Sequence, residues 1–91
     1  MNETNQGYEI ITAETYSTTR LGQESRVVLG RMETKYGVRF VTWECTRWPL
    51  KWGRMKSDYY WGHYFDDETQ ARADFHFRLF EKYGGKATRE S

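Results

Sequence analysis

The segment that most constrains this chain is an aromatic run followed by a bounded helical pattern. Residues 58–85 read DYYWGHYFDDETQARADFHFRLFEKYGG. Aromatic side chains favour strands, so residues 59–65 are expected to form one. Asp66 or Asp67 suits the start of a helix, where a carboxylate can accept a main-chain N–H, and Gly84 or Gly85 suits its end. The segment therefore predicts a strand at 59–65 and a helix at about 67–83.

Alternation along this strand predicts which side chains share a face. One face is expected to hold Tyr59, Trp61, His63 and Phe65, and the other Tyr60, Gly62 and Tyr64. Gly62 has no side chain, so we expect a bulge or the close approach of a neighbouring group at that position.

The helical pattern has an apolar stripe with a spacing of four residues. The stripe consists of Ala71, Phe75, Leu79 and Tyr83, with Phe80 at one edge. The opposite side of the helix consists of Gln70, Asp74, Arg78 and Glu81. Phe77 falls near the polar side. It either extends the apolar arc into a deep groove or contacts a partner, because an exposed large aromatic can mark an interface.

Three earlier strands are expected at residues 8–16, 26–32 and 38–46, where apolar and polar side chains alternate. Residues 47–57 contain Pro49 and Gly53 and are expected to form a loop or an irregular edge. The order β-β-β-β-α with short connections predicts a single small α+β domain. We expect a curved antiparallel sheet of about four strands packed against one C-terminal helix. The domain would span residues 8–85, between a disordered N-terminus at 1–7 and a flexible tail at 86–91.

Composition narrows the function classes. The net charge of +1 conceals an uneven distribution, because residues 26–65 hold eight bases and three acids. Cys45 is the lone cysteine, which excludes an intrachain disulfide and a cysteine-based zinc cluster, and we expect it to face the core. The start MNETNQGYEI lacks the pattern of a secretory signal, and no run approaches the roughly 20 apolar residues of a membrane span. A cytoplasmic protein is therefore expected.

The two histidines, His63 and His76, are the first candidates for catalysis or metal binding. Either role would require a histidine to converge with carboxylates or a nucleophile. The sequence shows no such spacing and no phosphate-binding glycine loop. We therefore expect no enzymatic activity, no cofactor and no metal site.

The basic, tryptophan-bearing residues 47–56 are the strongest candidate for a binding site. The candidate partner-binding residues are Arg47, Trp48, Lys51, Trp52, Arg54, Met55 and Lys56, together with Phe77. Three interpretations fit this composition. The indoles could close over the core while the charges stay solvated, Trp and Arg could anchor a protein partner, or the indoles could stack on unpaired bases while the cations meet phosphates.

A resemblance adds to this interpretation. The chain has VVLG at Val27–Gly30, VTW at Val41–Trp43 and YYWGHYF at Tyr59–Phe65, followed by an acidic helix start. In these segments it resembles a family of small bacterial and phage-borne proteins without assigned function. The resemblance implies an origin in bacteria or their mobile elements and transfers no active-site residues.

Two functions remain open at this stage. The first is a non-enzymatic protein-interaction module, with an inhibitor of a host defence system, such as an anti-CRISPR protein, as a specific case by analogy. The second is a module that binds single-stranded nucleic acid through residues 47–56. A homodimer is also open, because strands 8–16 and 59–65 could lie at unprotected sheet edges.

Overall fold

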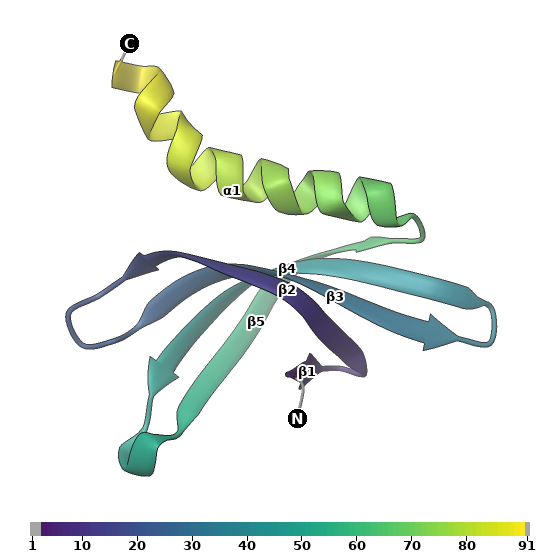
Figure 1. Cartoon of the computed structure of the whole chain (residues 1–91), viewed down its shortest axis with the longest axis horizontal. Helices are drawn as coiled ribbons and strands as arrows, with labels where there is room; N and C mark the ends of the chain where they lie inside the picture. The colour runs from purple at the N-terminus through teal and green to yellow at the C-terminus, as the bar shows by residue number, and fades with distance from the viewer. Residues whose placement is uncertain (1–2, 91) are drawn as a thin grey trace.

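The computed structural model describes residues 3–90, and side chains as far as residue 83. An antiparallel sheet of the order β1-β2-β3-β4-β5 is crossed on one face by a helix (Figure 1). The strands and helices are β1 (Thr4–Asn5), β2 (Tyr8–Thr18), β3 (Glu24–Thr34), β4 (Gly37–Pro49), the short 3₁₀ turn η1 (Lys51–Gly53), β5 (Met55–Phe65) and α1 (Glu68–Glu90). The single α+β domain with an antiparallel sheet and a C-terminal helix is confirmed, with five strands in place of about four.

The additional strand lies in the segment that was expected to be disordered. In β1, Thr4 pairs with Glu9 and Asn5 with Tyr8. The connecting residues Gln6 and Gly7 have φ values of 53° and 86°. Two consecutive positive φ angles are typical of the tight turn that joins antiparallel strands, so the local backbone accounts for the hairpin. Residues 1 and 2 of the expected disordered segment lie outside the described residues.

Helix α1 begins where the sequence predicted and ends later. The carboxylate of Asp67 accepts the main-chain N–H of Thr69 at 3.1 Å, which confirms Asp67 as a cap. The predicted end at Gly84 or Gly85 is wrong, because the helix continues through both to Glu90. Glycine permits the left-handed conformation that ends helices but does not impose it. Residues 86–90 of the expected flexible tail are therefore helical, and residue 91 lies outside the described part.

The central strands β3 and β4 are apolar on both faces, so the sheet has two cores. The core beneath the helix consists of Val27, Leu29, Phe40, Ala71, Phe75 and Leu79. The core on the opposite face consists of Tyr8, Val28, Val41, Trp43 and Cys45. Cys45 is buried, as expected.

Curvature of the sheet closes the second core without a further layer. Tyr8 of β2 lies 6.2 Å from Tyr64 of β5 between ring centroids, although these strands are not neighbours in the sheet. Both rings also contact Trp43, at 5.6 and 6.4 Å, and Tyr59 lies 5.5 Å from it. The β1–β2 and β4–β5 ends bend away from the helix (Figure 1). The strands themselves therefore enclose the Trp43 indole.

A bulge in β5 changes the faces predicted for this strand. Thr42 pairs with His63 and Glu44 with Tyr60, so Trp61 and Gly62 together oppose the single residue Trp43. The extra residue exchanges the two faces beyond it. Tyr59 consequently packs in the Trp43 core and Phe65 against the helix-side core, and the prediction that they share a face is wrong.

Gly62 has both properties that its sequence position suggested. It lies in the bulge, and a Cβ atom there would be 2.7 Å from the indole Nε1 of Trp43. Real side chains do not approach so closely, so only glycine leaves room for this indole.

A candidate interaction surface at two hairpin tips

Residues 47–56, predicted to be an irregular loop, mostly continue the β4–β5 hairpin. Arg47 pairs with Ser57, Trp48 with Lys56 and Pro49 with Met55, and only residues 50–54 form the turn. Pro49 is tolerated because it occupies the last pair of the ladder, where one missing N–H costs little. The candidate residues are therefore held by a paired strand end and not by a loose loop.

Trp52 lies at the apex of this turn and is 92% exposed. Its φ of 66° is left-handed, a conformation that costs a residue other than glycine about 1–2 kcal/mol. Gly53, at φ 72°, follows it. The turn thus places a large apolar side chain in solvent, on a residue whose left-handed backbone conformation is itself unfavourable.

Trp48 is half-buried, and the ammonium of Lys56 lies 5.6 Å from its ring centroid. A cation at this distance over an indole face is attracted to it. The interpretation in which the indoles close over the core does not hold for Trp52. Lys51, Arg54, Lys56 and Met55 are also exposed, whereas Arg47 is partly buried.

The β2–β3 turn adjoins this hairpin. A Cβ on Gly22 would lie 3.3 Å from Cγ of Pro49, so the two turns are in contact. Between them lies a shallow pocket of about 370 Å³, lined by Leu21, Gln23, Trp48 and Pro49. Leu21 is 88% exposed. We call the apolar residues of the two turns the tip surface: Leu21, Trp48, Pro49, Leu50, Trp52 and Met55.

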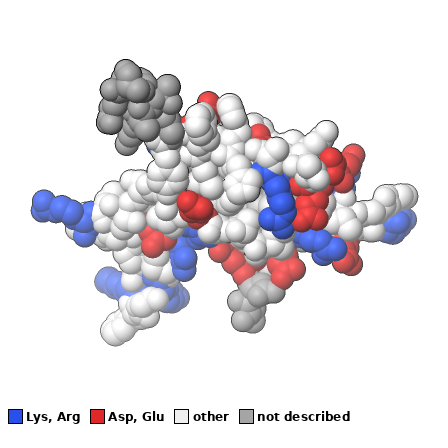
Figure 2. All heavy atoms as spheres, turned by 45° about the horizontal axis from the view of Figure 1, so that its top comes forward, with Lys and Arg blue, Asp and Glu red and all other residues white. Residues whose placement is uncertain are grey.

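Bases outnumber acids around the tip surface, where Glu24 is the nearest acid, opposite Arg47. Residues 47–56 carry four bases and no acid, and Arg20 adds a fifth base from the adjoining turn. Lys and Arg side chains project at the left end of the molecule in Figure 2, the end at which both turns lie in Figure 1. The sequence identified the β4–β5 half of this surface. It missed Leu21, because nothing in the sequence places the two turns together.

Beneath α1 lies a buried polar network that the sequence did not predict. Arg78, placed on the outer side of the predicted helix, is buried and donates to Glu44 at 2.9 Å and to Asp74 at 3.1 Å. It also donates to the hydroxyl of Thr42 at 3.1 Å. Glu44 accepts a hydrogen bond from Tyr16 at 3.3 Å and lies 3.7 Å from the ammonium of Lys82. The signal was Glu44 itself, because a carboxylate within the buried run VTWEC requires a cation.

The network perturbs the titration of two groups. Burial and the neighbouring Glu44 carboxylate raise the pKa of Tyr16 to about 12. Burial alone would raise the pKa of Asp74, but hydrogen bonds from Thr42, His63 and Arg78 outweigh it and hold that pKa below its ordinary value.

His63 and Asp74 are in contact, with 3.0 Å between Nδ1 and Oδ2, so one histidine does meet a carboxylate. The same Asp74 oxygen also accepts hydrogen bonds from Thr42 and Arg78, and none of these residues lines the pocket between the two turns. His76 stacks edge-on against Phe75 at 5.4 Å. Within residues 3–83, no cluster of three His, Cys, Asp or Glu side chains could hold a metal ion. The hydrogen bonds from Arg78 to Thr42 and Glu44 join the helix to the sheet.

Phe77 is 57% exposed and Phe80 is 60% exposed, so the groove interpretation of Phe77 is wrong and the partner-contact interpretation stays open. Phe80, expected at the edge of the stripe, also faces solvent, because the buried arc of α1 runs through Ala71, Phe75 and Arg78.

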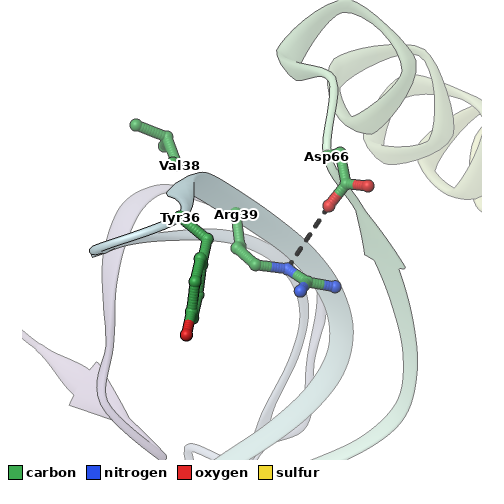
Figure 3. Close-up of a pocket in the computed structure, with 5 residues that line it drawn as sticks. Tyr36, Val38, Arg39 and Asp66 are labelled. Atoms are coloured by element: carbon green, nitrogen blue, oxygen red, sulfur yellow. Dashed lines mark ion pairs between the residues drawn. The ribbon is translucent and has the colours of Figure 1, made fainter.

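A second hollow, of about 470 Å³, lies at the opposite end of the sheet beside the β3–β4 turn. Arg39 reaches across it to Asp66 at 3.4 Å, and the exposed Tyr36 lies on the other side of Arg39 from Asp66 (Figure 3). Both charged side chains are well exposed, so the pair is screened and weak. This hollow has one ion pair and no apolar surface comparable to the tip surface.

Comparisons with protein-family models, curated proteins and solved structures find no match. The resemblance to small bacterial and phage-borne proteins, and the origin it implies, therefore stay predictions. Within the described residues, no helix has the length and apolar character needed to cross a bilayer.

Proposed function

We propose that this chain is a small non-enzymatic interaction module that binds another protein through the tip surface. The observation that carries the proposal is Trp52, an almost fully exposed indole in a left-handed conformation, on a turn whose neighbour carries the exposed Leu21. A water-exposed Trp has no hydrophobic contribution to make to folding. A partner that covers it would recover that contribution, and Trp is the residue most often found as an interface anchor.

The composition of the tip surface supports a protein partner over a nucleic acid. Stacking on unpaired bases needs flat aromatic rings along a cationic groove. Here only Trp48 and Trp52 are aromatic, and most of the tip surface is aliphatic or thioether: Leu21, Pro49, Leu50 and Met55. The shallow pocket holds one of the two indoles, Trp48, beside Leu21 and Pro49. The five surrounding bases would complement carboxylates at the rim of the partner's site. We infer an acidic partner surface with an apolar centre, and inhibition of a larger protein is one form that such binding would take.

The test compares a tip variant with a matched control at the other end of the molecule. Trp52→Ala combined with Leu21→Ser removes the exposed anchors, whereas Tyr36→Ala removes a side chain that is 87% exposed on the β3–β4 turn. Tagged full-length chains are incubated with bacterial lysate, and captured proteins are quantified by mass spectrometry. We expect a defined acidic protein to be captured by the wild type and by Tyr36→Ala and to be lost from the tip variant. Equal recovery by all three chains would remove the tip surface from the proposal.

A second measurement addresses nucleic acid directly. Fluorescence anisotropy with single-stranded and duplex oligonucleotides is recorded at low and at moderate salt. We expect no binding that depends on Trp52. Tight binding of single strands that weakens steeply with salt and is lost in Trp52→Ala would replace the protein partner with a nucleic acid.

A further inference from the structure

Strand β5 ends the sheet order, so one of its sides is free of the ladder. Its regular part runs from Met55 to Tyr60, between the η1 turn and the bulge at Trp61. Such an edge presents unpaired main-chain N–H and C=O groups and can pair with another strand.

The hydrogen bond that closes the β4–β5 turn shows which groups face outward. Leu50 donates its N–H to the carbonyl of Arg54 at 2.6 Å, so these residues form a hydrogen-bonded pair. Antiparallel pairs alternate between hydrogen-bonded and non-hydrogen-bonded. Continuing the register, Met55, Ser57 and Tyr59 turn their main-chain groups away from β4, toward the free edge.

The other edge of the sheet is less suited to pairing. Register shifts between Ile10 and Thr12 and between Thr15 and Ser17 leave only residues 12–15 of β2 regular, and β1 covers its start. Within these four residues Glu14 is the sole charge. An edge of this kind offers no opposite charge to a second copy of itself.

The charges on β5 are self-complementary. When two copies of a strand pair antiparallel about a two-fold axis perpendicular to the sheet, the residue on the axis faces its own copy. With Ser57 on the axis, Lys56 of each copy faces Asp58 of the other, and Met55 faces Tyr59. Lys56 and Asp58 then occupy non-hydrogen-bonded positions, at which opposing side chains are closest. Both side chains are exposed, and Lys56 would exchange its contact with the Trp48 ring for the carboxylate of the second copy.

We propose that this edge pairs with the same edge of a second copy, so that two five-stranded sheets join through β5 with Ser57 at the two-fold axis. A lone lysine on an edge strand would discourage pairing. Asp58, two residues later, converts that lysine into half of a reciprocal ion pair. The inference does not depend on the tip surface having a partner.

The test is a charge-reversal series measured by sedimentation equilibrium on the full chain. We expect the wild type to dimerise, and Lys56→Asp or Asp58→Lys to raise the dimer dissociation constant by on the order of tenfold, because two attractive pairs become two repulsive ones. The double variant Lys56→Asp/Asp58→Lys restores opposite charges in the same register and should recover the wild-type constant. Lys35→Asp, on the exposed β3–β4 turn, is the matched control and should not change it.

Ser57→Pro tests the main-chain part of the proposal. Proline on the free side of an edge strand removes an outward N–H and leaves the β4–β5 ladder intact. We expect a folded monomer, with folding checked by circular dichroism. A wild type that stays monomeric at its highest soluble concentration would overturn the proposal and leave the edge to a strand of a different protein. A double variant no better than the single reversals would overturn it as well.

Discussion

Arg78 of α1 donates a hydrogen bond to the main-chain carbonyl of Trp61, at the bulge of β5. Trp61 has a left-handed φ of 57°, and its carbonyl belongs to the strand segment that leaves room for Trp43. The same guanidinium contacts Glu44 and Asp74. One side chain thus joins the helix, the central strand and the bulged edge strand.

Replacement of Arg78 should be strongly destabilising, because it leaves Glu44 buried without its main cation. We expect Arg78→Ala to lower the free energy of unfolding by about 3–5 kcal/mol, the usual cost of breaking a buried pair. Arg72 is the control, since its pair with Glu68 is an exposed i,i+4 contact, and Arg72→Ala should cost less than about 0.5 kcal/mol. Urea denaturation measures both. If Arg78→Ala were as mild as Arg72→Ala, the network would be irrelevant to stability.

Gly62→Ala should disrupt the packing of Trp43. The added methyl group would lie 2.7 Å from the indole, and overpacking of this kind costs about 1–3 kcal/mol. Trp43→Phe creates space, so the double variant should be less destabilised than the sum of the two single changes. Additive effects would show that the close approach is not the cause. Chemical denaturation and near-ultraviolet circular dichroism follow the change.

The left-handed backbone conformation of Trp52 should lower the stability of the folded chain. Glycine adopts the left-handed conformation freely, so Trp52→Gly should be about 1 kcal/mol more stable than Trp52→Ala, despite the usual order of these residues. Both variants should lose partner binding, because each removes the indole. Thermal unfolding gives the first comparison and the capture experiment the second. A more stable Trp52→Ala would show that the turn does not hold this backbone in solution.

Asp74 should contribute an acid-sensitive part of the stability. Its pKa in the folded chain lies below the ordinary value of 3.8, so the folded state favours the carboxylate. The contribution is complete above that ordinary value and is lost as the pH falls from it through the lower folded pKa. Asp74→Asn should therefore be less stable than the wild type at neutral pH, with the difference shrinking in acid. A difference that is constant with pH would show that the charge of Asp74 is not involved.

The sequence predicted the main architecture because its signals are local. The alternation in Val41–Cys45 and the cap at Asp67 each reflect chemistry within a few residues, and both appear in the structure. The prediction of which β5 side chains share a face is wrong beyond Trp61, because one inserted residue reverses the alternation of faces along a strand. Gly62 indicated that position, but not which side chains would exchange sides.

The buried network and half of the tip surface could not be predicted because they depend on contacts distant in the sequence. Arg78 and Glu44 are 34 residues apart. The predicted stripe of Ala71, Phe75, Leu79 and Tyr83 leaves Arg78 outside, whereas the buried arc in the structure includes Arg78 and leaves Tyr83 exposed. Leu21 joins the tip surface only because its turn contacts Pro49. Trp52, in contrast, was identified from its local setting of bases and a glycine.

Apolar residues on both faces of β3 and β4 have a consequence for misfolding. In a sheet with one solvent-exposed face, a shift of one residue in strand register moves the apolar side chains into water. The free-energy cost of that exposure disfavours the shifted register. Here the apolar side chains of a shifted strand would move from one apolar core to the other, without exposure to water. Glu44 makes the shifted register unfavourable, because its carboxylate would move to the face opposite the helix and lose the Arg78 guanidinium. An acid whose buried cation lies on one side of the sheet only thereby discriminates the native alignment from its nearest competitor.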